Sequence, residues 1–176
     1  MNKKSASDEL DNPSASHLRR FVEGDIEGVV VDRLDCHEDS RGTLIELYRL
    51  DRFRPEYNPA MAYVSETLPG ASRGPHEHVQ QSDYLCFVGP GTFKLYLWDA
   101  RKESETYGNR STFEVGENNR MAVLVPCGVV HAYKNVCDHA GVVFNCPNRL
   151  YAGYKRKDPV DEVRHELRPD SPYVLD

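Results

Sequence analysis

The sequence predicts an all-β protein, a sandwich or a jelly roll, from two observations. Short runs of β-branched and aromatic residues recur between turn residues, while helical periodicity is scarce. The run 92–98 also alternates, with Phe93, Leu95 and Leu97 on one face and Lys, Tyr and Trp on the other. A period of two is typical of a strand. Strands this short and this regularly separated favour a sandwich or jelly roll.

Each predicted strand is a β-branched or alternating run. In chain order the strands are residues 28–31, 43–48, 60–66, 84–88, 92–98, 122–125, 130–135 and 141–145. Turn residues separate nearly all of them. No internal repeat is visible.

The domain organisation follows from length and composition. A chain of 176 residues with 39% hydrophobic content predicts one domain with one core. Residues 1–22 predict a disordered polar tail, because they hold too few apolar groups to offset the entropy of ordering. Residues 23–152 form the expected jelly-roll domain. Residues 153–176 are expected to pack on the barrel as a C-terminal extension, with a short helix that begins near Pro159 and is capped by Asp158.

Charge and cysteine content exclude several classes of function. The net charge of −6 argues against nucleic acid and against an anionic membrane surface as partners. No apolar run reaches the roughly 18 residues of a membrane helix, and the polar start has no signal-peptide core. The five cysteines are odd in number and contain no C-x-x-C pair, which predicts neither a disulfide framework nor a thiolate zinc site. We therefore expect a cytoplasmic protein.

Two motifs carry the chemistry. The first reads G-x5-H-x-H from Gly70 and contains His76 and His78; the second reads P-x-G-x2-H-x3-N from Pro126 and contains His131. Together they resemble the two signature motifs of a cupin, which implies a cupin jelly-roll β-barrel. We expect the segment 73–75 to form a turn into a strand whose inward side chains include both histidines of the first motif. All three imidazoles should then meet inside the barrel.

A metal site depends on the direction in which Asp83 points. If Gly91 ends the first motif, the inward acidic position falls on Tyr84 and Asp83 faces away; if Gly89 ends it, Asp83 faces inward. Because the residues from Gly91 onward look like the start of the next strand, we favour the first register and expect no metal or other cofactor. The alternative is a metal-dependent cupin enzyme with the ligands His76, His78, Asp83 and His131, a donor set that suits iron or manganese.

Four further segments resemble a particular branch of the cupins. They are Asp39-Ser40-Arg41-Gly42-Thr43-Leu44-Ile45-Glu46, Arg73-Gly74-Pro75-His76, the run from Trp98 to Gly108, and the run from Val125 to Ala132. In order and spacing they are similar to dTDP-4-dehydrorhamnose 3,5-epimerases, over roughly residues 28–150. The D-x-R-x-x-S-x-T-Y-G run is the most specific. The resemblance implies a metal-free jelly roll, a homodimer with shared strands, and a nucleotide-linked 4-keto-6-deoxy sugar as substrate.

The resemblance also implies roles for individual residues. His76 is expected to be the general base, as a neutral imidazole with a pKa near its ordinary value of about 6.5. Arg73 would bind the diphosphate or polarise the enolate. His131 would stabilise the enolate, and His78 is assigned to substrate binding beside it.

Arg41 and Glu46 resemble a nucleotide-contacting pair that reaches into the site of the neighbouring subunit. For these two residues, and also for Arg73, a purely structural ion pair is the alternative interpretation.

The departures from the family pattern put strict 3,5-epimerisation in question. Tyr84 stands where the family has a lysine, and Phe144 stands where it has its tyrosine acid. Asp161 is a candidate for the aspartate that orients the histidine. We therefore expect Tyr133 or Tyr84 to supply the acid, since both are predicted to face inward. The H-x-H form is also similar to sugar-nucleotide 3,4-ketoisomerases.

The function predicted from the sequence is a nucleotide-sugar epimerase or isomerase that removes a proton next to a 4-keto group, for deoxysugar or polysaccharide synthesis. Two other interpretations remain: the metal-dependent enzyme, and a non-catalytic sugar-nucleotide-binding protein.

Overall fold

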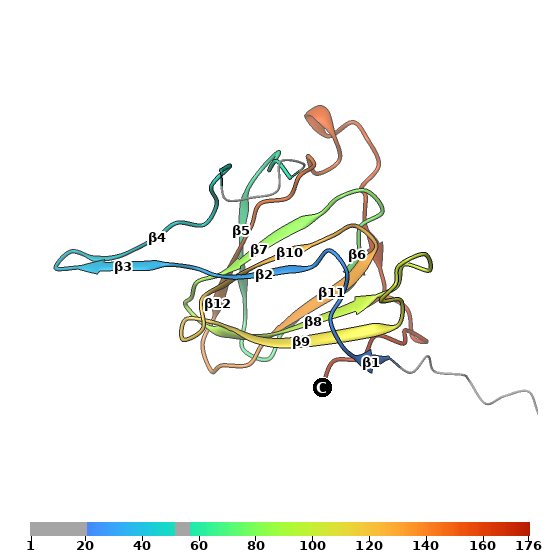
Figure 1. The fold of residues 1–176 in the computed structure, drawn as a ribbon, viewed down its shortest axis with the longest axis horizontal. Helices are drawn as coiled ribbons and strands as arrows, with labels where there is room; N and C mark the ends of the chain where they lie inside the picture. The colour runs from blue at the N-terminus through green and yellow to red at the C-terminus, as the bar shows by residue number, and fades with distance from the viewer. Residues whose placement is uncertain (1–20, 52–56) are drawn as a thin grey trace, which may run out of the picture.

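Two stacked sheets and one separate hairpin make up the fold, as the computed structural model describes it for residues 21–51 and 57–176 (Figure 1). The six-stranded sheet has the order β1 (Val22–Glu23), β9 (Asn109–Gly116), β8 (Thr92–Asp99), β11 (Val129–Asn135), β6 (Ser72–Glu77) and β13 (Val163–Arg164). The five-stranded sheet has the order β2 (Val30–Arg33), β10 (Met121–Val125), β7 (Asp83–Phe87), β12 (Gly141–Asn145) and β5 (Tyr63–Thr67). The hairpin consists of β3 (Cys36–Asp39) and β4 (Gly42–Ile45). The predicted all-β jelly roll is confirmed.

The main apolar core lies between the two sheets. Phe93, Leu95 and Leu97 of β8 point into it, together with apolar side chains of β7, β9, β10, β11 and β12. Tyr96 and Trp98 have the opposite parity and lie in a second cluster on the outer side of the six-stranded sheet. The alternation predicted for residues 92–98 is therefore confirmed.

The outer faces of both sheets are covered as well. Tyr173 and Leu175 of the C-terminal segment pack against the outer cluster of the six-stranded sheet. On the five-stranded sheet, Tyr84 and Cys86 of β7 lie in a third cluster with Tyr57. Because β7 is buried on both faces, every one of its residues is buried and its sequence shows no apolar alternation.

The eight predicted strands overlap β2, β4, β5, β7, β8, β10, β11 and β12. The strand expected after residues 73–75 corresponds to the end of β6, which begins earlier, at Ser72. Four of the described strands were missed: β3 and β9 carry mainly polar residues, and β1 and β13 have two residues each. Backbone hydrogen bonds to neighbouring strands hold these segments in the sheets. An apolar sequence pattern does not predict such bonds.

The turn expected at residues 73–75 is wrong, because these residues lie inside β6. Arg73 pairs with Tyr133 of β11. Gly74 has a φ of +79°, and a Cβ added there would lie 2.4 Å from the carbonyl oxygen of His131. Only glycine adopts this conformation readily and leaves room for the neighbouring backbone. The close approach of β6 to β11 therefore depends on Gly74.

The helix expected from Pro159 is also wrong. The C-terminal segment has a single 3₁₀ turn at Tyr154–Arg156, and the strand β13 follows and pairs with β6. The Asp161 carboxylate accepts hydrogen bonds from backbone N–H groups of residues 79–81, in another part of the chain. These long-range bonds outweigh the local helix signal of a proline preceded by an aspartate.

Other predictions about the chain lie partly beyond the described residues. Residues 1–20 of the predicted tail, which runs to residue 22, lie outside the described residues. The last residue of that tail, Val22, belongs to β1.

No helix among the described residues has the length and apolar character needed to cross a bilayer. The five cysteines, all in the described part, are free thiols. The cytoplasmic location stays a prediction.

Gly74→Ala should lower the free energy of unfolding by about 1–3 kcal/mol more than Gly70→Ala does. Both glycines have positive φ, but a Cβ at Gly70 meets no atom within 4 Å. The difference between the two variants, measured by urea unfolding, therefore isolates the contact with β11. Equal losses of stability in the two variants would show that β6 can move away from β11 at no cost in free energy.

Candidate active site

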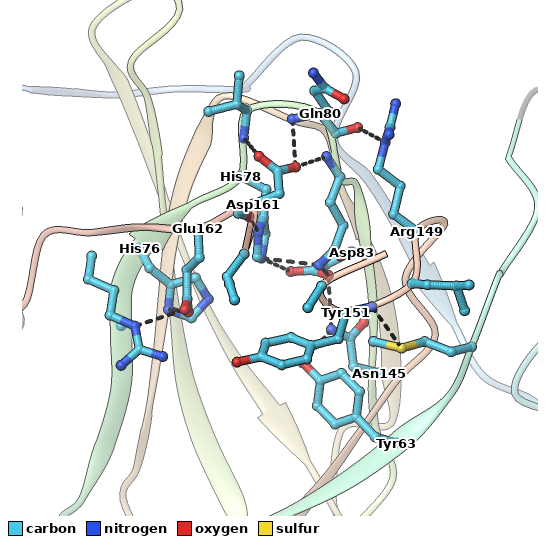
Figure 2. A pocket seen from close by; sticks show the side chains of 18 of the residues that line it. Tyr63, His76, His78, Gln80, Asp83, Asn145, Arg149, Tyr151, Asp161 and Glu162 are labelled. Atoms are coloured by element: carbon cyan, nitrogen blue, oxygen red, sulfur yellow. Dashed lines mark hydrogen bonds and ion pairs between the residues drawn. The ribbon is translucent and has the colours of Figure 1, made fainter. Parts of the chain in front are cut away.

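A deep pocket opens at one end of the barrel, with a volume of ≈ 1290 Å³. Side chains of β5, β6, β7, β11 and β12 form its inner wall, and the segment that follows β12 closes one side. Figure 2 shows His76, His78, Asp83, Asn145 and Tyr151 gathered around this space. The wall thus combines residues that lie far apart in the sequence.

The structure brings the three motif histidines together. His76 of β6 and His131 of β11 are direct partners in the antiparallel pairing of these strands, and their ring centroids lie 4.4 Å apart. His78 follows the end of β6, with its ring 5.6 Å from that of His76 and 5.9 Å from that of His131. The pairing of β6 with β11 therefore brings the two motifs together inside one barrel, as expected.

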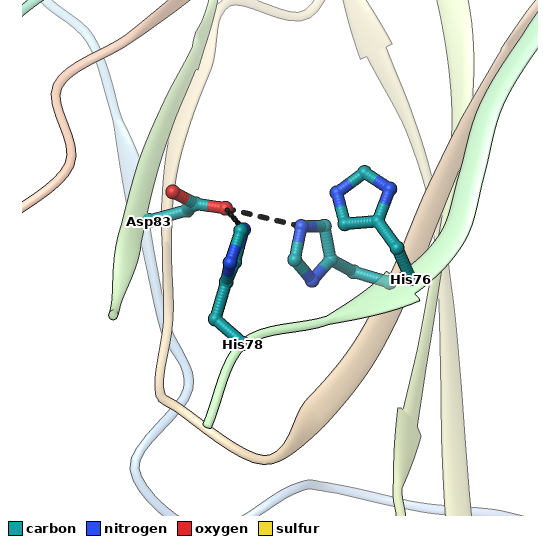
Figure 3. A group of neighbouring side chains, drawn as sticks. His76, His78 and Asp83 are labelled. Carbon is teal, nitrogen blue, oxygen red and sulfur yellow. Dashed lines mark ion pairs between the residues drawn. The ribbon is translucent and has the colours of Figure 1, made fainter. Parts of the chain in front are cut away.

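The register expected for β7 is wrong. Asp83 points into the pocket beside the histidines, whereas Tyr84 packs on the outer face of the five-stranded sheet (Figure 3). Leu85 and Phe87 share the parity of Asp83 and lie in the inner core. Apolar residues of both parities are buried in this strand, so its sequence did not reveal which side faces the interior. The inward side chain at the start of β7 is therefore a carboxylate and not the expected phenol.

The Asp83 carboxylate is the centre of a hydrogen-bond network. Its Oδ2 lies 3.2 Å from Nε2 of His78 and 3.2 Å from Nε2 of His131. Its Oδ1 accepts from the Gln81 amide at 2.9 Å and from the Asn145 amide at 3.0 Å. Burial acts to raise the pKa of Asp83, but the bonds to His131 and His78 outweigh it and lower the pKa well below its ordinary value. The group is a buried carboxylate anion.

His76 is buried on the inner wall and has a strongly lowered basicity. Burial, followed by the proximity of His131 and His78, lowers the pKa of His76 to about 2. The predicted neutral form is supported, but the expected ordinary pKa is wrong. The Glu162 carboxylate lies 3.8 Å from Nδ1 of His76, where it can stabilise a proton taken up by the ring.

Asp161, which the sequence suggested as the aspartate that orients the histidine, acts on a different ring. Its backbone carbonyl accepts a hydrogen bond from Nδ1 of His78. Its carboxylate holds the loop that follows His78 through the N–H groups of Val79, Gln80 and Gln81. The residue near His76 is the next one, Glu162, which the sequence analysis missed.

Among the described residues, four tyrosines line the pocket, and two of them, Tyr63 and Tyr133, lie on strands of the barrel. Tyr133 is predicted correctly to face the same side as His131, and its hydroxyl bonds to Ser65 at 2.8 Å. Tyr63 of β5 was missed; its hydroxyl accepts a hydrogen bond from Asn145 at 2.9 Å. Burial raises the pKa of Tyr63 to about 12 and also raises that of Tyr133, so both keep their proton at neutral pH. Tyr84, on the outer face, has no access to this space.

Phe144, the residue aligned with the family's tyrosine acid, also packs on the outer side of the five-stranded sheet. Its neighbour Asn145 faces the pocket instead. A polar residue in an otherwise apolar strand was the signal that could have identified Asn145 in the sequence.

Of the two arginines predicted to bind substrate, Arg73 lies at the pocket and Arg41 lies on a distant hairpin. Arg73 lines the pocket and donates hydrogen bonds to the Glu66 carbonyl and the Thr67 hydroxyl. Arg149, which the sequence analysis missed, lines it too and donates to the Gln80 carbonyl.

Arg41 lies at the turn of the β3–β4 hairpin, which extends away from the barrel (Figure 1). It pairs there with Asp39. Glu46 pairs with Arg49, outside the pocket. Within one chain, therefore, neither member of the predicted nucleotide-binding pair reaches the site.

The D-x-R-x-x-S-x-T-Y-G run has a structural role in this chain. The buried Asp99 carboxylate accepts hydrogen bonds from the Arg101 guanidinium, from Ser104 at 2.6 Å and from Thr106 at 2.6 Å. The network holds the connection between β8 and β9, and none of its members lines the pocket.

Comparison with known proteins decides the family. Residues 23–162 match the family described as dTDP-4-dehydrorhamnose 3,5-epimerase. The chain belongs to this epimerase family. The match includes every strand from β2 to β12 and ends at Glu162, the residue beside His76, just before β13.

Individual relatives and a solved structure are consistent with this assignment. Over 139 residues the chain is 35% identical to a probable low-salt glycan biosynthesis epimerase of Haloferax volcanii, covering 78% of this chain and 86% of the relative. It is 38% identical over 109 residues to a spore coat polysaccharide biosynthesis protein of Bacillus subtilis, covering 62% and 71%. A crystal structure of a 3'-monoepimerase from Streptomyces bikiniensis in complex with dTDP-quinovose matches with a TM-score of 0.69 at 26% identity, covering 81% and 71%.

Proposed function

We propose that this family member is an epimerase or isomerase of a nucleotide-linked 4-keto-6-deoxyhexose, and that it works by removing a proton from a carbon next to the keto group. Its relatives are named for glycan and spore coat polysaccharide biosynthesis, which supports a role in deoxysugar or polysaccharide synthesis. The dTDP-sugar in the related monoepimerase supports a nucleotide sugar as the substrate class.

The observation that carries the proposal is the position of His76 on the pocket wall, with Glu162 3.8 Å from its Nδ1. Burial lowers the pKa of His76, so the ring is neutral and one of its nitrogens has a lone pair that can accept a proton. A 4-keto group acidifies the protons on the neighbouring carbons, and a fixed imidazole beside such a carbon can remove one. Glu162 then lies in position to stabilise the imidazolium that forms.

The substrate's other groups have partners around the same pocket. The negative charge that develops on the keto oxygen needs positive charge or hydrogen-bond donors. Both ring nitrogens of His78 and of His131 already contact Asp83 and a backbone carbonyl. The guanidinium groups of Arg73 and Arg149 on the pocket wall are therefore the groups that can face the keto oxygen and the diphosphate. Both guanidinium groups are positioned by backbone carbonyl groups, which reduces the entropy lost on binding.

A proton donor is needed on the opposite side of the sugar, and we assign this role to Tyr63. Its hydroxyl is at the pocket and linked through Asn145 to Asp83. Tyr133 is the alternative, but its ring is built into the core against Phe87 and Phe93, and its hydroxyl is bonded to Ser65. Tyr133 therefore has the contacts of a structural residue.

The active form is proposed to be a homodimer. The β3–β4 hairpin extends from the barrel with Arg41 at its turn, and Leu44 is 65% exposed on it. A hairpin that carries an exposed apolar side chain is suited to lie on a second copy of the chain. Arg41 would then contact the nucleotide bound in the partner's pocket.

The first test is proton NMR with dTDP-4-keto-6-deoxyglucose in D2O. The wild-type chain should exchange the C3 proton, the C5 proton or both, which also counts the epimerised carbons. His76→Ala should slow this exchange by about 10²-fold or more. His139→Ala, at an exposed histidine outside the pocket, should exchange like the wild type. Exchange that is unchanged in His76→Ala, or absent in the wild type with every nucleotide sugar tried, would reject the proposal.

Tyr63→Phe should retain His76-dependent exchange but form the inverted product at least about 10²-fold more slowly, because the enolate still forms and loses only its proton donor. Tyr133→Phe should retain both exchange and inversion. Chromatography of the product sugars separates the two activities. The opposite pattern, with inversion lost only in Tyr133→Phe, would assign the acid to Tyr133.

Light scattering should give twice the 20.1 kDa mass of one chain. Arg41→Ala should raise KM about tenfold with little change in kcat, since it removes one charged contact to bound nucleotide. When Arg41→Ala and His76→Ala chains are mixed and allowed to exchange, mixed dimers should recover a site with the wild-type KM. A monomeric mass, or a KM that mixing does not restore, would contradict the shared site.

A further inference from the structure

The geometry points to a metal site: we propose that His78, Asp83 and His131 bind one divalent first-row transition-metal ion, directly beside His76. The donor atoms of all four residues lie within 4.8 Å of one another. Figure 3 shows the Asp83 carboxylate facing the histidine rings in this cluster. The inference does not require the proposed reaction.

The separations between the donor atoms fit a shared ion. Oδ2 of Asp83 lies 3.2 Å from Nε2 of His78 and 3.2 Å from Nε2 of His131. Two donors bound to one ion at about 2.1 Å are about 3.0 Å apart at a right angle and about 3.4 Å apart at a tetrahedral angle. The carboxylate oxygen therefore already lies at a suitable separation from each histidine nitrogen.

Both histidines are held from behind by oxygen acceptors. Nδ1 of His78 bonds to the Asp161 carbonyl, and Nδ1 of His131 lies 3.2 Å from the Val129 carbonyl. A carbonyl oxygen only accepts, so each Nδ1 carries the proton. In metal sites a ligating histidine usually donates its other N–H to such an oxygen, which fixes the ring and directs the Nε2 lone pair to the ion.

The carboxylate is held in the matching way. The Gln81 and Asn145 amides occupy its Oδ1 and leave Oδ2 directed at the histidines. One carboxylate oxygen is then available as a single ligand, and the other is fixed by hydrogen bonds. The side chain of Asp83 is 2% exposed, so bulk water does not solvate its carboxylate.

Without a cation, two Nε2 atoms converge on one carboxylate oxygen. If each Nδ1 holds the only proton of a neutral ring, both Nε2 lone pairs face that oxygen. If one ring takes a second proton, it pairs with Asp83 but the lone pair of the other ring still faces the oxygen; if both rings do, two buried imidazolium ions share one carboxylate. The Gln81 amide lies 3.2 Å from Nε2 of His78 and can satisfy that ring. The hydrogen bonds of the described residues provide no similar donor for Nε2 of His131. A metal ion satisfies both rings in their neutral form.

The donor set selects the kind of ion. Two imidazoles and one carboxylate suit Fe²⁺, Mn²⁺, Co²⁺, Ni²⁺ or Zn²⁺, whereas Ca²⁺ and Mg²⁺ prefer oxygen ligands. An ion here would supply a Lewis acid beside the base. His76 is left out of the ligand set because no carbonyl oxygen of the described residues fixes its ring from behind, as one does for His78 and for His131. The group nearest its Nδ1 is the Glu162 carboxylate, 3.8 Å away.

The test is the metal content of the full chain, purified without chelators and with an affinity tag that contains no histidine. Elemental analysis should find about one transition-metal ion per chain in the wild type and in the control His139→Ala. After stripping, added Co²⁺ should restore one equivalent with visible absorption. Asp83→Asn, which keeps the shape of the side chain, and His131→Ala should bind Co²⁺ at least about tenfold more weakly. His76→Ala should retain most of the metal.

Several outcomes would overturn the inference. A wild-type chain that holds no metal and shows no Co²⁺ spectrum has no such site, and this result does not depend on whether any variant folds. Equal Co²⁺ affinity in Asp83→Asn and the wild type would reject Asp83 as a ligand. Loss of metal in His76→Ala as complete as in Asp83→Asn would reject the division between ligands and base. Because no readout uses a sugar substrate, failure of the epimerase assay leaves the result intact.

Discussion

The Asp83 carboxylate joins the two sheets at the pocket end of the barrel. It is carried by β7 of the five-stranded sheet and contacts His131 of β11 in the six-stranded sheet, as well as His78 after β6. Removing such a group from water is costly, and in this site two amides and two imidazoles offset the cost. The positions of the histidine rings, and hence the shape of the chemical end of the pocket, depend on this one anion.

The C-terminal segment completes what the barrel begins. Asp161 holds the loop after β6 with its carboxylate and the ring of His78 with its carbonyl, and Glu162 faces His76. At the other end of the segment, Tyr173 covers Trp98 on the outside of the six-stranded sheet. A segment with weak local structure is therefore ordered by contacts at both ends, and the site and the stability of the sheet share the same residues.

Much of the fold was predictable because it rests on local patterns. The alternation of Phe93, Leu95 and Leu97 identified an inward face, and the spacing of the two histidine motifs indicated one barrel. The errors occurred where tertiary contacts override local preference. The turn expected at Gly74 is part of a strand, and the helix expected from Pro159 gave way to pairing with β6. In both places long-range backbone hydrogen bonds decide the conformation.

The fold class, the family and the three histidines could be predicted from the sequence, because periodicity and residues at set spacings carry this information. The side to which Asp83 points, and the partners that surround it, depend on tertiary packing. The cause is the burial of β7 on both faces, where Tyr84 and Leu85 are equally covered. A strand of this kind has no polar face to reveal its orientation, so its register is set by packing against β10 and β12.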